Sequence, residues 1–130
     1  MSDRSADTGD SHPQWPTAML TALRLGRRLV TEVPASAPGR RAFVEIRPVA
    51  TTADSDARRQ QWTRSDRDRT FTIEQWDYDG DRLAGFDYDI GAVLVQAVTV
   101  TGEAPLVAAI EAWNLRPDQF RHPWQTDDPR

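Results

Sequence analysis

The sequence contains no cysteine and no lysine, and each absence narrows what the chain can do. Without cysteine, disulfides and thiolate chemistry are excluded, and a reducing, cytoplasmic location is the expectation. All sixteen basic residues are arginine, and the chain has a single asparagine, Asn114. Because arginine codons can be GC-rich whereas lysine and asparagine codons are A-rich, this usage indicates a bacterial genome of high GC content and no special demand for arginine.

Long apolar runs are also absent from the sequence. No segment approaches the length of a membrane span, so we expect no contact with a membrane. The acidic N-terminal sequence lacks the basic-then-apolar order of a signal peptide. A length of 130 residues fits one domain. We expect residues 1–14 to be a disordered tail, residues 15–121 to form the domain, and residues 122–130 to be a flexible tail.

The net charge of −4 conceals a segregation along the chain. Residues 24–69 carry eleven arginines and six acidic residues, whereas residues 70–130 carry four arginines and eleven acidic residues. The middle of the chain is therefore basic, and the C-terminal half is acidic. Such asymmetry affects association rates and the charge of the partner that a protein attracts.

The chain before residue 70 contains helix and strand patterns. Pro16 opens a predicted helix that ends near Leu25, and predicted strands follow over residues 28–33 and 42–47. Residues 34–39, PASAPG, are a strong turn signal between them. The polar segment 50–69 is predicted to be a long charged loop that holds one helical turn or a ragged strand around Trp62.

The stretch WDYDGDRLAGFDYDIG, residues 76–91, contains an aromatic-Asp-Tyr-Asp unit twice. Its Asp79-Gly80 pair is a favoured centre for a two-residue type I′ turn, so the stretch predicts a β-hairpin. With that turn, Ile73 lies opposite Phe86, which joins β-branched and aromatic side chains across the two strands.

The C-terminal part has two further signals. Residues 92–101, AVLVQAVTVT, are rich in β-branched residues and predict a central strand that returns against the second strand of the hairpin. Residues 103–114 predict a helix that stops at Asn114, and residues 116–120 predict one helical turn. Together the patterns predict an α+β fold, with an antiparallel sheet of about four to five strands and with N-terminal and C-terminal helices on one face.

Metal and catalytic sites find little support in the sequence. Asp77, Asp79 and Asp81 alternate as in an EF-hand loop, but the glycine and glutamate that such a loop needs are missing. Glu74 and Asp87 are the one candidate pair for acid–base chemistry. The two histidines lie in terminal segments, and no phosphate-binding loop is present. We therefore assign no catalytic residue, metal or cofactor, and we leave open whether the protein is an enzyme.

The segment RRQQWTRSDRDR, residues 58–69, combines arginines with an aromatic residue, a composition that suits nucleic-acid or anion contact. Two aspartates interrupt it and the whole chain is acidic, which argues against nucleic acid as the main partner. The residues that would make such contacts are Arg58, Arg59, Trp62, Arg64, Arg67 and Arg69.

The leading hypothesis from the sequence is a small protein-binding domain, of the immunity-protein or antitoxin type, that engages a basic partner through an acidic aromatic hairpin. The alternatives are a small-ligand or carboxylate-based site in a pocket between the sheet and the helices, and nucleic-acid binding through residues 58–69. The residues of the leading hypothesis are Glu74, Trp76, Asp77, Tyr78, Asp79, Asp81 and Asp87.

Overall fold

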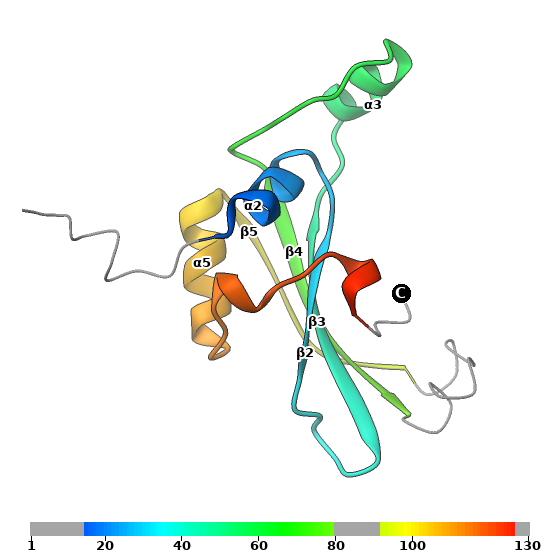
Figure 1. Cartoon of the computed structure of the whole chain (residues 1–130), viewed down its shortest axis with the longest axis vertical. Helices are drawn as coiled ribbons and strands as arrows, with labels where there is room; N and C mark the ends of the chain where they lie inside the picture. The colour runs from blue at the N-terminus through cyan, green and yellow to red at the C-terminus, as the bar shows by residue number, and fades with distance from the viewer. Residues whose placement is uncertain (1–14, 80–91, 127–130) are drawn as a thin grey trace, which may run out of the picture.

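The structure is a computed structural model that describes residues 15–79 and 92–126 of the chain. In Figure 1, helices and short C-terminal turns surround one twisted antiparallel sheet, which is the predicted α+β class. The elements are, in order, α2 (Thr17–Arg24), β2 (Leu29–Val33), β3 (Arg40–Pro48), α3 (Thr52–Arg59), β4 (Thr70–Asp79), β5 (Val93–Thr101), α5 (Glu103–Ala112), and the 3₁₀ turns η1 (Pro117–Gln119) and η2 (Pro123–Gln125).

The sheet is a meander in which each strand pairs with its neighbour in sequence, in the order β2-β3-β4-β5. Strands β2 and β3 confirm the predicted strands, and α2 confirms the predicted helix before Leu25. Helix α5 confirms the helix predicted from residue 103 onward. It ends where Asn114 takes a left-handed backbone with a φ of 62°, a conformation that asparagine tolerates better than most residues.

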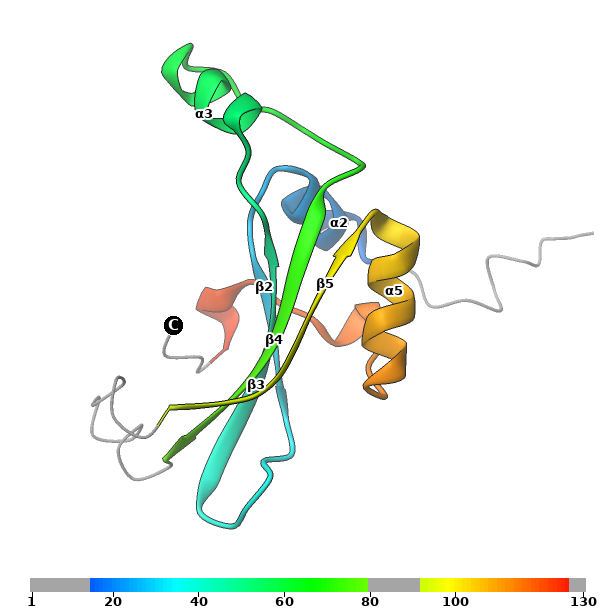
Figure 2. The ribbon, with the colours of Figure 1, turned by 180° about the vertical axis from the view of Figure 1, so that it is seen from behind.

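The main core lies between the sheet and helices α2 and α5, which cover the same face (Figure 2). Successive side chains of a strand point to opposite faces, so Phe71 and Ile73 of β4 share this face with Val44 and Ile46 of β3. The buried residues of this core are Ala22, Leu23, Leu29, Val44, Ile46, Phe71, Ile73, Leu106, Ile110, Leu115 and Phe120.

A second, smaller cluster lies on the opposite face of the sheet, where Val30, Phe43 and Tyr78 are buried together. The outer edge of β2 is also covered there. The Val30 N–H donates to the Arg121 carbonyl at 2.9 Å, and the Arg121 N–H donates back to Val30 at 2.8 Å. The C-terminal segment therefore covers one edge of the sheet.

The predicted pairing of Ile73 with Phe86 is wrong. Ile73 lies opposite Val98 on β5 and opposite Ile46 on β3. Both edges of β4 are therefore occupied along this stretch, whereas Phe86 lies outside the described residues. A local turn signal sets the register only when the strand that follows it is the best partner. Strand β5 supplies the observed partner, with pairs that run from Thr70 opposite Thr101 to Asp77 opposite Val93.

Strand β5 also differs from its prediction, because within residues 15–79 and 92–126 it lies at the edge of the sheet and not in its centre. Most of its side chains are exposed accordingly. A run of β-branched residues is common to buried central strands and to some edge strands, so composition alone does not separate the two.

Segment 50–69 is more structured than the predicted loop, because it contains the two-turn helix α3. The helix begins at a capping box. The Asp54 N–H donates to the Thr51 hydroxyl at 3.2 Å, and the Thr51 N–H donates to the Asp54 carboxylate at 2.9 Å. These two bonds satisfy backbone donors that a helix start otherwise leaves unpaired. Only Ala57 of α3 is buried, so polar contacts hold most of the helix in place.

The β4–β5 register can be tested by cross-linking, since the chain has no native cysteine. Thr72 lies opposite Thr99. The neighbouring Gly102 N–H donates to the Arg69 carbonyl at 2.9 Å, so alternation makes Thr72 and Thr99 a non-hydrogen-bonded pair. Such pairs have Cα atoms about 4.5 Å apart, within disulfide reach. A Thr72→Cys/Thr99→Cys variant should therefore oxidise to an intramolecular disulfide, detected by mass spectrometry.

A Thr72→Cys/Asp87→Cys variant is the control, because an Asp79-Gly80 two-residue turn would place residues 72 and 87 opposite each other. Efficient cross-linking of this second pair, with free thiols in the first, would contradict the observed register.

Candidate functional site

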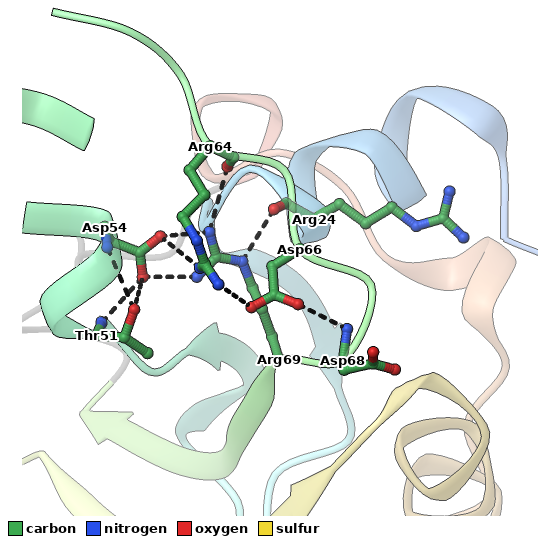
Figure 3. Close-up of polar contacts among 7 residues, drawn as sticks. All are labelled: Arg24, Thr51, Asp54, Arg64, Asp66, Asp68 and Arg69. Carbon is green, nitrogen blue, oxygen red and sulfur yellow. Dashed lines mark hydrogen bonds and ion pairs between the residues drawn. The ribbon is translucent and has the colours of Figure 1, made fainter. Parts of the chain in front are cut away.

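A buried arginine connects α3 to the rest of the fold. Arg69, which directly precedes β4, is only 3% exposed. Its guanidinium donates to both carboxylate oxygens of Asp54, at 2.7 and 2.8 Å, and its Nε donates to the Arg24 carbonyl at 2.9 Å (Figure 3). A bidentate pair of this kind fixes orientation as well as distance. Arg69 therefore holds α3 against the end of α2.

A second arginine extends this network to the loop after α3. Arg64 donates to Asp54 at 3.1 Å and to Asp66 at 2.7 Å. Asp66 in turn accepts the Asp68 N–H at 2.9 Å, and its own N–H donates to the Arg24 carbonyl at 2.9 Å. The loop from residue 60 to residue 69 is therefore tied to the same carboxylate and the same carbonyl as the helix.

Gly26, in the turn between α2 and β2, lies against the Arg69 guanidinium. Its φ of +85° is a conformation that residues with a side chain rarely adopt. A Cβ at this position would meet the Arg69 Nη2 atom at 3.4 Å, and the turn thus leaves room for the guanidinium.

The network lowers the pKa of both carboxylates that it contains. Hydrogen bonds from the Arg69 guanidinium are the main reason why the pKa of Asp54 lies well below its usual range, and Thr51 and Arg64 add to the effect. The pKa of Asp66 is lowered mainly by the Asp68 N–H. Asp54 is therefore ionised at neutral pH and already engaged by two arginines, which does not suit a general acid or base.

A cleft of about 350 Å³ opens beside this network, between α3, the α2–β2 turn and the end of β3. Four arginines and one aspartate contribute to its lining, so the walls carry a net positive charge. The lining residues are Leu25, Gly26, Arg27, Pro48, Ala50, Asp54, Ala57, Arg58, Trp62, Thr63, Arg64 and Arg69.

The four arginines of the cleft divide into two kinds. Arg64 and Arg69 are engaged by Asp54 and lie within the wall. Arg27 and Arg58 are exposed, and within the described residues neither has a carboxylate or other polar side-chain partner. Trp62 is 54% exposed beside them, with its indole N–H donating to Gln60 at 3.1 Å. The cleft therefore presents two unpaired guanidinium groups and an aromatic ring.

The structure brings four of the six residues predicted in segment 58–69 to this cleft: Arg58, Trp62, Arg64 and Arg69. Arg59 instead pairs with Asp56 along α3, and Arg67 is exposed outside the cleft lining.

Sequence reasoning missed two parts of the site. The first is Asp54, although Thr51-x-x-Asp54 is a visible capping-box pattern that could have revealed both the helix and its acidic start. The second is Arg27, which is distant in sequence and which no local signal links to α3.

The acidic stretch is less accessible than the leading hypothesis requires. Asp77 is 1% exposed and accepts hydrogen bonds from the Ser36 hydroxyl and from the Ser36 N–H. Tyr78 is 3% exposed within the second hydrophobic cluster, so the expectation of an exposed Tyr78 is wrong. The two side chains point to opposite faces of β4. Asp77 is held by Ser36 in the turn between β2 and β3, and Tyr78 packs against Val30 and Phe43.

Of the other residues of that hypothesis, the structure describes Glu74, Trp76 and Asp79. Glu74 pairs with Arg47 at 3.2 Å and accepts the Trp76 indole N–H at 3.2 Å, while Asp79 ends β4. The carboxylate that lies directly across the sheet from Glu74 is Glu45. Glu74 also lies opposite Ala97 of β5, so its predicted cross-strand pairing with Asp87 is wrong. Asp81 and Asp87 themselves lie outside the described residues.

A second hollow, of about 380 Å³, lies between the sheet and the end of α5, close to where the sequence suggested a ligand pocket. Glu74 does not line it. Its one charged side chain, Glu32, is paired with Arg41 at 2.8 Å. The remaining lining is uncharged: Val33, Pro34, Val44, Gln75, Trp113, Asn114, Leu115 and Gln119.

The described part of the chain contains no cluster of three or more histidine or acidic side chains placed to share a metal ion. None of its helices combines the length and apolar character needed to cross a bilayer.

Comparisons with known proteins identify no relative. No protein-family model matches the chain, no curated protein matches it, and no solved structure matches its fold.

The contribution of the Arg69–Asp54 pair can be measured with Asp54→Asn. Breaking a buried pair leaves an uncompensated buried guanidinium and should lower the free energy of unfolding by about 3–5 kcal/mol. Asp56→Asn is the matched control on the same helix, because its partner Arg59 is exposed; it should cost less than about 1 kcal/mol. Urea unfolding of both variants tests this, and equal costs would contradict it.

The same pair predicts a pH dependence. The pKa of Asp54 is lower in the folded protein than its unfolded value of about 3.9, so its contribution is fully present above that pH. It is lost as the pH falls through the folded-state pKa. The stability difference between wild type and Asp54→Asn should therefore shrink progressively below about pH 4. A difference that stays constant from neutral pH to strong acid would contradict this account.

Proposed function

We propose that this protein binds a small anionic ligand with a flat ring, such as a nucleoside monophosphate, in the cleft beside α3. One observation carries the proposal: Arg27 and Arg58 have no partner within the described residues, and both line a cleft next to the half-exposed Trp62. A guanidinium group can donate two hydrogen bonds at once to two oxygens of a phosphate or carboxylate. An exposed indole offers a surface on which a ring can stack.

The properties of the cleft support a ligand of this class. Its volume of about 350 Å³ lies at the lower end of the range of small-ligand sites. Asp54 would repel an anion if it were free, but Arg64 and Arg69 neutralise it. Arg27 and Arg58 can then attract the anionic part of the ligand. Because Asp54 is ionised and engaged, we propose binding and not acid–base catalysis.

The other candidate functions are supported less well. An acidic hairpin that binds a basic protein remains a proposal for Glu74, Trp76 and Asp79, with Asp81 and Asp87 outside the described residues. Burial removes Asp77 and Tyr78 from such a surface. Nucleic-acid binding through the same arginines remains an alternative, and a cytoplasmic location remains part of the proposal. The experiment below separates the nucleic-acid alternative from a small ligand.

Isothermal titration with the four common ribonucleoside monophosphates, inorganic phosphate and uncharged adenosine tests the proposal. At least one monophosphate should bind, more tightly than either phosphate or adenosine alone. Arg58→Gln and Arg27→Gln should each weaken its binding about tenfold or more, the usual effect of losing a hydrogen bond between charged groups. Trp62→Ala should remove the preference for a monophosphate over inorganic phosphate.

Arg67→Gln is the matched control, because Arg67 is exposed in the same loop, has no partner within the described residues, and lies outside the cleft lining. It should leave binding unchanged. Absence of binding by every monophosphate would overturn the proposal. Tight binding of a thymidine decamer, weakened equally by Arg58→Gln and Arg67→Gln, would favour nucleic acid, since phosphate contacts along a strand contribute similarly.

A further inference from the structure

The second hollow, between the sheet and the end of α5, differs in its chemistry from the cleft at α3. Its volume of about 380 Å³ falls within the range of small-ligand sites. Among the described residues that line it, only Glu32 is charged, and both carboxylate oxygens of Glu32 accept hydrogen bonds from Arg41, at 2.8 and 2.9 Å. A charged ligand would therefore find no free counter-charge to replace its hydration. The second hollow favours an uncharged molecule.

Side-chain amides from three parts of the fold line the second hollow. Gln75 belongs to β4, Asn114 follows the last residues of α5, and Gln119 ends η1. The Gln119 side-chain oxygen accepts the Arg116 N–H at 2.6 Å, which leaves its NH₂ group to donate elsewhere. Within the described part of the chain, the Asn114 side chain has no hydrogen-bond partner. The lining thus offers uncharged polar groups that a ligand can engage.

Asn114 has a backbone conformation that glycine adopts most readily. Its φ of 62° lies in the left-handed region, directly after the C-cap of α5, where glycine is the usual residue. Asparagine brings to this position a side chain that glycine would lack, and the side chain lines the second hollow. Its amide can accept and donate side by side. The matching group on a ligand has its carbonyl and N–H on the same side of one amide bond, as in a primary amide or a lactam.

Apolar side chains form much of the remaining wall. Val44 and Leu115 are 1% and 6% exposed and belong to the main core. Val33 and Pro34 contribute from the end of β2, and the half-buried Trp113 contributes an indole ring. Small-ligand sites commonly combine apolar and aromatic walls with a few polar groups that fix the orientation of the ligand. The apolar wall here requires a ligand with an apolar ring or chain.

We propose that the second hollow binds a small uncharged amide, namely a primary amide or a lactam that carries an apolar ring or chain. Asn114 exchanges hydrogen bonds with the amide group of the ligand, the Gln119 NH₂ group donates to a ligand carbonyl, and Trp113 packs against the apolar part. The second hollow and the cleft at α3 share no described lining residue. This site is therefore independent of the function proposed for the cleft.

NMR titration of the full chain with two matched ligands tests the proposal. The cyclic dipeptide of leucine and glycine has two lactam groups and an apolar chain, and it should bind. The linear dipeptide of the same two amino acids carries two charges, and it should bind about tenfold more weakly or less, because its charges find no partner. Benzamide, a primary amide with an apolar ring, is the second probe. Binding should shift the side-chain amide signals of Asn114 and Gln119.

Asn114→Gly removes the side-chain amide but keeps a backbone that glycine adopts without strain. It should weaken binding of the cyclic dipeptide about fivefold, the usual effect of losing a hydrogen bond between uncharged groups, and it should not lower the urea midpoint of unfolding. Gln61→Gly is the matched control, because Gln61 has the same φ of 62° after the end of α3 and lies outside the second hollow. It should leave binding unchanged.

Gln119→Glu keeps an oxygen that can accept the Arg116 N–H but replaces the NH₂ donor by a carboxylate oxygen, and it should abolish binding. Absence of binding by both the cyclic dipeptide and benzamide would overturn the proposal, as would equal affinity for the linear dipeptide. Full affinity in Asn114→Gly would overturn it too. Joint loss of stability and binding in Asn114→Gly would also overturn it, since the side chain would then support the fold and not the ligand.

Discussion

The position of α3, and with it the shape of the candidate site, depends on a bidentate ion pair between Arg69 and Asp54. Helix α3 buries a single side chain and so has little apolar surface to hold it. Arg69 directly precedes β4 in the chain, and its Nε donates to the Arg24 carbonyl at the end of α2. Through its pair with Asp54 it therefore connects α3 to both β4 and α2. A buried guanidinium is costly unless its donors are satisfied, and here Asp54 and backbone carbonyls accept them.

The Arg69–Asp54 pair also separates the arginines of the cleft into two groups, one that holds the structure together and one that is proposed to bind a ligand. Asp54 neutralises the two arginines that lie within the wall of the cleft. Arg27 and Arg58 line the same cleft, are exposed, and have no acidic partner within the described residues. The acidic C-terminal half has a different role near the sheet: Asp77 is buried and bonded to Ser36, so part of its negative charge stabilises the β2–β3 turn region and does not face a partner.

Local pattern was sufficient to predict helices α2 and α5, most strands and the α+β class, because these depend on periodicity, prolines and turn residues, but it missed helix α3. It failed where two partners competed for one strand: the Asp79-Gly80 signal favoured Phe86 opposite Ile73, but β5 supplied Val98. The candidate site was half predictable. The arginines and Trp62 were visible as a cluster in sequence, whereas Arg27 and Gly26 join them only through the tertiary fold, and Asp54 required recognition of the capping box.

Amide hydrogen exchange in an Arg69→Met variant tests the central claim most directly, because this change leaves the Thr51–Asp54 capping box intact. The amides of Ser55, Gln60 and Trp62, which donate within and just after α3, should lose their protection, while amides in the β3–β4 ladder keep most of theirs. Unchanged protection in α3 would contradict the claim that Arg69 holds this helix. Equal loss across the whole sheet would contradict it too, since Arg69 would then support the entire fold and not the site in particular.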